Sequence, residues 1–370
     1  MSPADSISFA RGAPSADIID LDGLKEAAAR AFEDDPAGTT AYGTAIGYVP
    51  LREWIAEKHG VEASQVIVTN GSMQADAFLF DALVQPGDAV IVERPTYDRT
   101  LLGLRERGAD IVPVDLQSDG LDVEALAELL DGGLRPKLAH VIPNFQNPAG
   151  YTLSRAKRDR LLELAREYDF VVFEDDPYVE LRFAGQTLPT MLSLDTDGHV
   201  VYASSFSKTV CPGIRVGYLV GPPELIARIV RMATNTYISP NMVAQSIVNQ
   251  FVRSGRIQSS IETVKAALQE RSGRLAEALR RELPDARFVP TEGGYFMWVD
   301  LPEDVDVDAV FTAAGERGVA IVKGSDFLLE GGQHSMRLAY SGVTPEQIDE
   351  GVRRLADAVR AVRGVAQTTA

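Results

Sequence analysis

Short apolar runs recur through the first two thirds of the chain, each of four or five residues and rich in β-branched side chains. Near-continuous apolar runs of this length are typical of strands that are covered on both faces. Between them lie segments with apolar residues at helical spacing, such as 122–130 and 155–168. The pattern predicts an α/β fold in which helices sandwich a mostly parallel, seven-stranded sheet. The expected strands are 66–69, 89–92, 111–114, 138–142, 170–173, 200–203 and 217–220.

The pattern changes after the last of these strands. A long helical stretch is expected over 223–278, with an interruption at Ser254-Gly255, and shorter strand-like runs with helices between them follow. A chain of 370 residues is long enough for two domains. We therefore expect an N-terminal arm packing on the small domain, a large α/β domain and a small α+β C-terminal domain. Their expected ranges are 1–35, 36–255 and 256–370.

Composition narrows the possible partners. The net charge of −17 argues against nonspecific binding to nucleic acid or an anionic membrane, and no apolar run has the length of a membrane span. The single cysteine, Cys211, allows no intrachain disulfide and fits a reducing compartment. The four histidines lack metal-ligand spacing. We expect a cytoplasmic protein that uses no metal.

A lysine with neighbouring hydroxyls follows the expected strand 200–203. It is Lys208, in Ser205-Phe206-Ser207-Lys208, and Arg215 follows seven residues later after a Pro-Gly turn. A lysine amine attacks aldehydes well only when its pKa is depressed, and serines with an arginine can cradle an anion. An amine beside a phosphate cradle is what an enzyme needs to hold pyridoxal phosphate as a Schiff base. Taken alone, a solvated loop lysine fits this stretch equally well.

Other strand ends carry further candidates, since ligands bind at the carboxyl ends of parallel strands. Ser72 opens a helix where backbone amides could hold an anion, although it also reads as an ordinary helix cap. Tyr97 could stack on a planar ring or could belong to the core. Asn147 could donate a hydrogen bond to a phenolate oxygen or could belong to an Asn-Pro turn.

Three acids end the strand at 170–173, in Glu174-Asp175-Asp176-Pro177-Tyr178. A carboxylate at the end of a buried strand is costly unless it meets a cation or a donor, and a pyridinium N–H would be such a donor. Tyr178 could then reach the opposite side of the same ring. An exposed loop or a metal site are the alternatives, and a metal is disfavoured because no histidine joins the acids.

Taken in chain order, the segments at these strand ends, with a few others, resemble the motifs of class I/II pyridoxal-phosphate aminotransferases of fold type I. The resemblance is closest to the α-aminoadipate and kynurenine aminotransferase subgroup. The resemblance covers nearly the whole chain from Ile7 onward. The motifs that carry it are Tyr42-Gly43, Gly47-Tyr48-Val49-Pro50-Leu51-Arg52, Gly71-Ser72-Met73-Gln74, Asn147-Pro148-Ala149-Gly150, Asp175-Asp176-Pro177-Tyr178, Ser205-Phe206-Ser207-Lys208, Arg215 and Met336-Arg337-Leu338.

The resemblance implies a role for each cofactor residue. Lys208 would form the Schiff base with pyridoxal 5′-phosphate and move the proton, and Asp175 would pair with the pyridine nitrogen. Tyr178 and Asn147 would hydrogen-bond the ring's 3-oxygen, and Tyr97 would stack on the ring. The phosphate would be held by Ser72, the backbone amide of Met73, Ser205, Ser207 and Arg215.

The resemblance also implies the reaction and the assembly. Arg337, helped by Asn147, would grip the substrate α-carboxylate. The amino group of an L-amino acid would pass to a 2-oxo acid, by expectation 2-oxoglutarate, with ping-pong kinetics. Tyr42 would reach the phosphate of a neighbouring subunit, which makes the expected enzyme a homodimer.

Some positions depart from the family pattern. Arg11-Gly12 stands where relatives have two glycines, and the chain starts almost directly at Ile7, so a helical lid of related enzymes is not expected. Both residues are expected at the substrate entrance, where Arg11 would favour acidic side chains; a solvent-facing arginine is the alternative. Lys323 stands where relatives often have proline, as a second cation at the site or an exposed one.

Rival functions use the same residues or the same domain. Decarboxylation, β-elimination or oxidation of an amino acid could run on the same scaffold. A transcription regulator would carry a winged-helix segment before the domain; none fits ahead of Ile7, and the acidity argues against DNA binding. A noncatalytic role is disfavoured because Lys208, Asp175 and Arg337 are all present.

Overall fold

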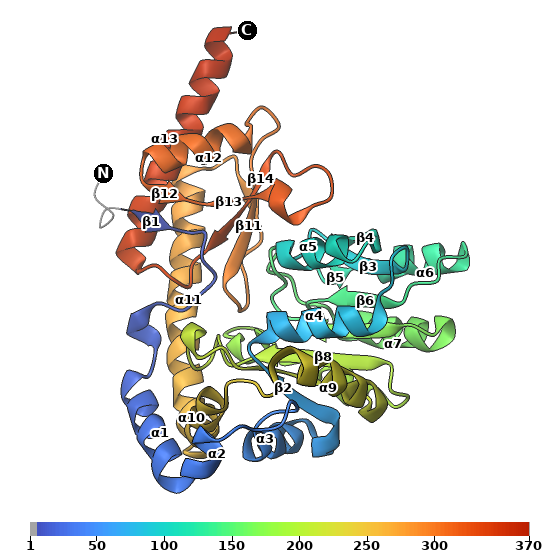
Figure 1. Cartoon of the computed structure of the whole chain (residues 1–370). Helices are drawn as coiled ribbons and strands as arrows, with labels where there is room; N and C mark the ends of the chain where they lie inside the picture. Colours follow the sequence, from blue (N-terminus) through green and yellow to red (C-terminus); the bar gives the residue numbers. More distant parts are fainter. Residues whose placement is uncertain (1–5, 370) are drawn as a thin grey trace.

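The central element of the fold is an eight-stranded sheet. The computed structural model describes the backbone of residues 6–369 and the side chains of residues 6–364. Along the sheet the order is β2, β9, β8, β7, β6, β3, β4, β5 (Figure 1). The bounds are β2 (Val66–Thr69), β3 (Ala89–Arg94), β4 (Asp110–Gln117), β5 (Gly120–Leu121), β6 (Leu138–Val141), β7 (Val171–Asp175), β8 (Val200–Ser205) and β9 (Gly217–Val220).

The pairing is parallel in the middle of this sheet and antiparallel at its edges. β4, β3, β6, β7 and β8 pair in parallel, whereas β9 runs antiparallel to both β8 and β2. All seven expected strands are present, and the mostly parallel α/β fold is confirmed. The eighth strand, β5, pairs antiparallel with the end of β4. The sequence does not predict β5, because a strand of two residues is too short to show a hydrophobic period.

Helices cover both faces of the sheet. On one face α4, α5 and α9 pack against the strands, and on the other α6, α7 and α8 do so. Each contributes an apolar stripe, such as Ala75 and Leu79 of α4, to the buried layer. The bounds are α4 (Ser72–Leu83), α5 (Asp98–Glu106), α6 (Val123–Asp131), α7 (Arg155–Tyr168), α8 (Met191–Leu194) and α9 (Pro223–Tyr237).

The helical stretch expected over 223–278 breaks twice, not once. α9 ends at Tyr237, Ile238 adopts a left-handed φ of 65°, and α10 (Met242–Arg253) follows with Asn241 as its N-cap. The second break, before α11 (Arg256–Glu282), is the expected one. The first was signalled by Pro240, which lacks the N–H that a continuous helix needs.

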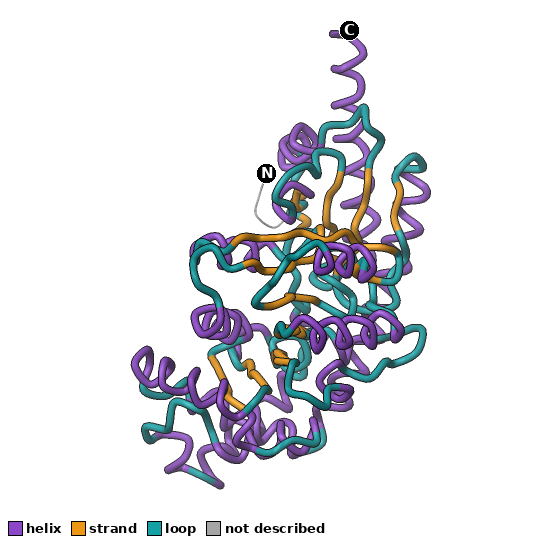
Figure 2. Tube along the Cα trace, turned by 90° about the vertical axis from the view of Figure 1, so that its right-hand side faces the viewer, coloured by secondary structure: helices purple, strands orange, loops and turns teal. Residues whose placement is uncertain are grey.

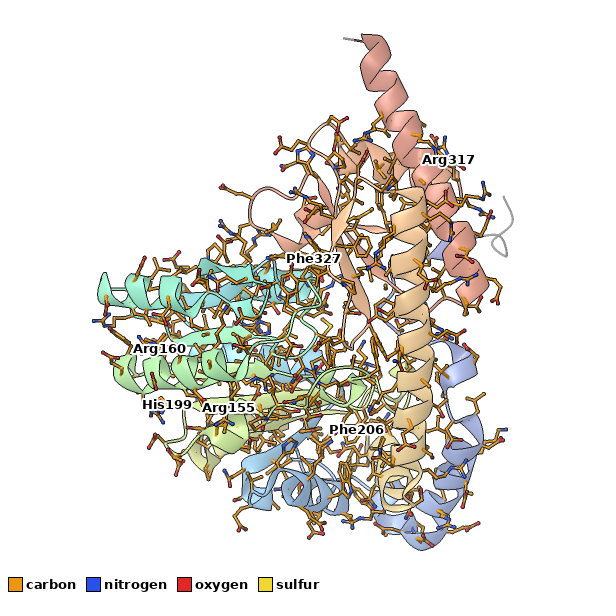
Figure 3. All side chains as sticks on the ribbon, turned by 180° about the vertical axis from the view of Figure 1, so that it is seen from behind. Arg155, Arg160, His199, Phe206, Arg317 and Phe327 are labelled. Carbon is orange, nitrogen blue, oxygen red and sulfur yellow. The ribbon has the colours of Figure 1, made fainter. Side chains whose placement is uncertain are left out.

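The C-terminal part is built on a smaller antiparallel sheet of four strands. Figure 2, in which all strands of the molecule are orange, shows the strands near the C-terminal end. The long helix α11 packs against α13, and these two helices lie side by side in Figure 3. Two short strands, β12 and β13, follow α12, with Ile321 between them. The bounds are β10 (Arg287–Phe288), β11 (Phe296–Asp300), α12 (Val307–Glu316), β12 (Val319–Ala320), β13 (Val322–Lys323), β14 (Ser335–Ala339) and α13 (Pro345–Thr369).

The N-terminal segment contacts both parts of the molecule. β1 (Ile7–Ser8) pairs in parallel with β12, while α1 (Leu21–Asp34) and α2 (Pro36–Thr40) pack on α10, beside α3 (Val49–His59). The domain boundaries stay a prediction. Within residues 6–369 no helix is both long and apolar enough to cross a membrane.

Candidate active site

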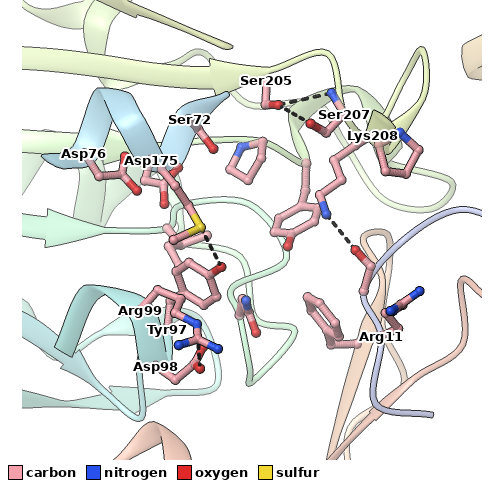
Figure 4. A pocket seen from close by; sticks show the side chains of 18 of the residues that line it. Arg11, Ser72, Asp76, Tyr97, Asp98, Arg99, Asp175, Ser205, Ser207 and Lys208 are labelled. Carbon is pink, nitrogen blue, oxygen red and sulfur yellow. Dashed lines mark hydrogen bonds and ion pairs between the residues drawn. The ribbon is translucent and has the colours of Figure 1, made fainter. Parts of the chain in front are cut away.

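A cavity of about 420 Å³ lies at the carboxyl ends of the strands of the large sheet (Figure 4). Loops after five strands line it, together with the N-terminal segment, β11 and β14. The geometry thus brings together nearly all of the site residues expected from the sequence. Those that line the cavity are Arg11, Gly12, Ser72, Met73, Tyr97, Asn147, Asp175, Tyr178, Ser205, Ser207, Lys208, Arg215 and Arg337.

Lys208 projects into this cavity from the loop that follows β8. Its Nζ donates a hydrogen bond to the carbonyl of Gly12 at 2.7 Å and lies 5.2 Å from the ring centre of Tyr295. Burial, and after it the positive charges of Arg337 and Arg215, lower the pKa of the Lys208 amine to about 8. About a tenth of this amine is therefore neutral, and nucleophilic, at pH 7.

The two serines before Lys208 form a compact hydroxyl cluster. Ser205 Oγ donates to Ser207 Oγ at 2.9 Å and accepts from the Ser207 amide at 3.1 Å. Arg215, which has a left-handed φ of 49°, donates from Nη1 to Ser207 Oγ at 3.2 Å. No carboxylate among the described residues forms an ion pair with Arg215. Hydroxyls beside an uncompensated guanidinium make a site for an anion.

The N-terminus of α4 completes this cradle. Ser72 is the first residue of the helix, so its unpaired backbone amides add positive partial charge. Gly71 has a φ of 89°, and a Cβ there would collide with the Arg215 guanidinium. A Cβ on Gly217 would collide with the backbone amide of Ser72. These glycines allow strand, helix and arginine to meet closely.

Asp175 supplies a buried acceptor at the end of β7. It is 5% exposed, and its Oδ1 has no hydrogen-bond partner among the described residues. Its Oδ2 lies 3.4 Å from Nε2 of the buried His140 on β6. A buried carboxylate oxygen without a donor is costly, so this position is suited to a ligand that brings an N–H.

The other two acids of the run have protein partners instead. Glu174, on the opposite face of β7, accepts from the amides of Met191 and Leu192 at 2.8 Å each. Asp176 accepts from Asn144 Nδ2 at 2.8 Å. Burial raises the pKa of Glu174 to about 7 and that of Asp176 to about 8. The described residues contain no cluster of acids, histidines and cysteines arranged to hold a metal ion.

Tyr97 and Tyr178 are aromatic walls of the cavity. Tyr97 follows β3 and donates from its hydroxyl to Met73 Sδ at 3.9 Å; burial raises its pKa to about 12. Tyr178 is 4% exposed, and burial raises its pKa strongly. Both phenols therefore stay protonated and can donate hydrogen bonds at physiological pH.

Arg337 enters from β14, in the C-terminal sheet. It donates to Asn147 Oδ1 and to the Ala10 carbonyl, both at 2.8 Å, while its Nε has no partner. Its guanidinium lies between the rings of Phe296 and Phe327, at 4.2 and 4.7 Å from their centres. No carboxylate in the described part of the chain pairs with it, so the buried cation is free to bind an anionic ligand.

Of the residues that depart from the family pattern, Arg11 and Gly12 line the cavity and Lys323 does not. Arg11 lines the cavity with an exposed side chain, and no described acid forms an ion pair with it. Gly12 packs under the Phe296 ring, which leaves no space for a Cβ. Lys323 does not line the cavity; its Nζ pairs with Asp308 at 2.7 Å. The structure thus places Arg11, and not Lys323, at the site.

Tyr42 is the one expected site residue outside the cavity. It is 88% exposed, among the most exposed of the large side chains. Its expected role needs a second subunit.

The sequence analysis missed several residues that line the cavity. Asp98 and Arg99 begin α5 and pair with each other at 3.4 Å. Asp76 lies one helical turn after Ser72, on the same face of α4. The helix expected from residue 72 onward, read at i, i+4 spacing, would have pointed to Asp76.

The three main features of the cavity match the three functional groups of pyridoxal 5′-phosphate. The amine of Lys208 suits its aldehyde, the unpartnered Oδ1 of Asp175 suits a protonated ring nitrogen, and the cradle at Ser205, Ser207 and Arg215 suits its phosphate. The residues present therefore fit this cofactor.

Comparison with known proteins points the same way. A family model described as aminotransferase class I and II matches residues 4–355. The aromatic-amino-acid aminotransferase 1 of Thermococcus litoralis is 33% identical, over 96% of this chain and 88% of that protein. The 2-aminoadipate transaminase of Thermus thermophilus is 34% identical, over 96% of this chain and 90% of that protein.

Solved structures agree in fold. The α-aminoadipate aminotransferase of Thermus thermophilus, complexed with N-(5′-phosphopyridoxyl)-L-leucine, superposes with a TM-score of 0.94 at 32% identity, over 99% of this chain and 96% of that one. The kynurenine aminotransferase of Pyrococcus horikoshii gives a TM-score of 0.92 at 33% identity, over 96% and 91% of the two chains. The protein described here therefore belongs to the class I and II aminotransferases, with fold type I and pyridoxal 5′-phosphate as its cofactor.

Proposed function

We propose that this aminotransferase carries the amino group of an L-amino acid to 2-oxoglutarate in two half-reactions, with Lys208 as the group that moves the proton. The observation that carries this proposal is the lowered pKa of the Lys208 amine, about 8, in a cavity that also holds Arg337 and Asp175. Bound pyridoxal phosphate supplies an aldehyde that links to amines and a ring that accepts electrons.

Each residue of the cavity has a proposed task toward that cofactor. Asp175 accepts from the ring nitrogen, supported by its unpartnered Oδ1. Tyr178 and Asn147 donate to the ring's 3-oxygen, and Tyr97 covers the ring. The phosphate is held by Ser72, the Met73 amide, Ser205, Ser207 and Arg215, whose hydroxyls and charge already converge.

Substrate binding is proposed to centre on Arg337. Its guanidinium is held by Asn147 and two phenylalanine rings, so it offers a fixed fork to the α-carboxylate. Lys208 Nζ, in the same cavity, would then take the proton from the substrate α-carbon and deliver it to the former aldehyde carbon of the cofactor. In the second half-reaction it would move a proton in the opposite direction. Because one product leaves before the second substrate enters, the kinetics are ping-pong.

Arg11 is proposed to favour substrates with acidic side chains. Its exposed guanidinium at the cavity wall, without an ion-pair partner among the described residues, supports this role. We expect Arg11→Gly to lower the ratio of kcat/KM for glutamate to that for leucine by about two- to fivefold, the effect of one solvent-screened ion pair. Arg11→Lys is the matched control that keeps the charge. An unchanged ratio in Arg11→Gly contradicts the proposal.

The proposed assembly is a homodimer in which Tyr42 reaches the phosphate site of the partner. Its 88% exposure, outside the cavity of its own chain, supports this placement. We also propose a cytoplasmic location, supported by a single cysteine, Cys211, that forms no disulfide. The division into 1–35, 36–255 and 256–370 remains a proposal, supported by the helix break at 254–255.

Product analysis tests the proposed reaction. The purified protein is given an L-amino acid and 2-oxoglutarate, and the 2-oxo acid, glutamate, carbon dioxide, ammonia and peroxide are measured. We expect one glutamate for each 2-oxo acid formed. Carbon dioxide, ammonia or peroxide in stoichiometric amounts would instead indicate decarboxylation, elimination or oxidation.

A further inference from the structure

Asp76 is a buried acid on an otherwise apolar helix face. Its neighbours on the inward side of α4, among them Ala75, Phe78 and Leu79, belong to the core under the large sheet. Asp76 is 8% exposed and lines the active-site cavity. In Figure 4 its carboxyl group lies next to that of Asp175, which comes from β7. A position chosen only for packing would carry an apolar side chain here.

Neither carboxyl of this pair is fully satisfied by the protein. Oδ1 of Asp76 and Oδ1 of Asp175 both lack hydrogen-bond partners among the described residues. Burial, and after it the charge of Asp175, raise the pKa of Asp76 well above its ordinary value. Two carboxyls in one space of low dielectric constant cannot both ionise at low cost. Asp76 therefore keeps its proton to a higher pH than an ordinary aspartic acid does.

No cation among the described residues forms an ion pair with Asp76, so none offsets the cost of ionising it. His140 on β6 faces Asp175, at 3.4 Å from its Oδ2. Tyr97, after β3, has its own pKa raised by burial, with the charges of Asp98, Asp175 and Asp76 adding. Four of the cations that line the cavity have other contacts; they are Arg99 on α5, Lys208 and Arg215 beyond β8, and Arg337 on β14. A fifth, Arg11 in the N-terminal segment, has an exposed side chain that forms no ion pair with a described residue.

We propose that Asp76 is a positioning residue for the cofactor, which keeps a proton beside Asp175 and thereby adjusts how strongly Asp175 holds the ring nitrogen of pyridoxal phosphate. No group has to be added or lost for this role, because Asp76 only keeps its own proton. When Asp76 releases that proton at higher pH, a second negative charge enters the pocket. That charge favours the cationic form of the bound cofactor.

Two variants and a matched control test this role. Asp76→Asn keeps the shape but cannot titrate, and Asp76→Leu removes the polar group. Asp81→Asn makes the same change on the same helix at an exposed acid that pairs with Arg107. All are prepared without cofactor for stability measurements and with pyridoxal phosphate for absorbance titration.

The first readout needs no cofactor. An unfolded chain releases the Asp76 proton near pH 4, the ordinary pKa being about 3.9, whereas the folded apoprotein retains it to a higher pH. The stabilising contribution of protonated Asp76 is therefore complete below about pH 4, the pKa in the unfolded chain. It is lost as the pH rises from there toward the raised pKa of the folded protein. Between those limits the free energy of unfolding of the native protein should fall relative to that of Asp76→Asn. Asp81→Asn should follow the native curve.

The second readout is the absorbance of the bound cofactor as a function of pH. The native protein and Asp81→Asn should titrate in a broad transition in which a second group takes part. Both Asp76 variants should give a single, sharper transition with a midpoint lower by about one pH unit, because the second negative charge is absent. If Asp76→Leu fails to fold, Asp76→Asn decides alone. Unchanged absorbance curves in Asp76→Asn overturn the proposal, even where stability changes.

Discussion

The three consecutive acids Glu174, Asp175 and Asp176 differ in function because their hydrogen-bond partners differ. Glu174 and Asp176 are tied to backbone amides and to Asn144, whereas Asp175, between them, keeps one oxygen unpartnered in the cavity. Strand alternation explains why only one of three consecutive acids faces the ligand. Two lysines also differ because their surroundings differ. Burial lowers the pKa of Lys208, whereas the hydrogen bond to Asp22 raises the pKa of Lys25 on the surface.

The reactivity of Lys208 in the apoprotein should follow its lowered pKa. An amine reacts with acylating or alkylating reagents only in its neutral form, so the labelling rate should rise with a midpoint near pH 8. Lys25, whose pKa is raised, serves as the control and should label only at higher pH. Quantitative peptide mass spectrometry follows both residues in one sample. A Lys208 midpoint no lower than that of Lys25 contradicts the assigned environment.

Arg337 should govern substrate binding without governing cofactor binding. Arg337→Lys keeps the charge but loses the two-pronged geometry, and Arg337→Met loses both. We expect KM for the amino acid to rise about 100-fold in Arg337→Met, the loss of a charge-assisted hydrogen-bonded pair, and less in Arg337→Lys. Cofactor affinity, measured by absorbance titration, should stay near the native value. Equal KM values in all three proteins would remove Arg337 from its proposed role.

At the scale of elements, close approach of backbones shapes the phosphate cradle. β9 passes directly beside the N-terminus of α4, with Gly217 against the Ser72 amide. A side chain at residue 217 would push the helix N-terminus away from the anion position. We therefore expect the strength of phosphate binding to depend on a contact between a strand and a helix that are far apart in the sequence.

Gly217→Ala should weaken cofactor binding. The added methyl group costs about 1–3 kcal/mol of overpacking, which corresponds to a cofactor Kd raised by about tenfold or more. Gly213→Ala is the matched control, because a Cβ at residue 213 meets no atom within 4 Å. Equilibrium titration with pyridoxal phosphate measures both. Matching Kd values for the two variants would show that the close contact has no bearing on the cradle.

The sequence predicted those elements whose patterns are local. Apolar runs bounded by turns gave the seven long strands, and the motif residues at their ends converge in one cavity. It did not predict β5, which is too short for a pattern, or the helix break before α10. Asp76 and His140 were missed as partners of Asp175 because their proximity depends on how α4 and β6 pack, which no single segment encodes.

At the scale of the whole molecule, the cavity is built from segments across the entire chain. Ala10, the loops of the large sheet and Arg337 all contribute, so the site exists only when both sheets and the N-terminal segment are assembled. Phe327, labelled in Figure 3, stands at this junction: its carbonyl accepts from the Thr96 amide at 3.0 Å, and its ring packs on Arg337.

Mixing two inactive variants should restore activity if Tyr42 completes the partner's site. Lys208→Ala supplies an intact Tyr42, and Tyr42→Ala supplies an intact Lys208, so a mixed dimer contains one complete site. After joint unfolding and refolding, or co-expression, we expect transaminase activity well above the sum of the separate variants. Activity that stays at that sum would contradict the shared site, provided that mass analysis detects the mixed dimer.

The most direct test of the whole account is the position of the covalent link to pyridoxal phosphate. The purified protein is incubated with the cofactor, reduced with borohydride, digested and sequenced by mass spectrometry, beside Lys208→Ala. We predict one phosphopyridoxyl group per chain, on Lys208, and none in the variant. A label on another lysine, or equal labelling of the variant, would contradict the proposed site.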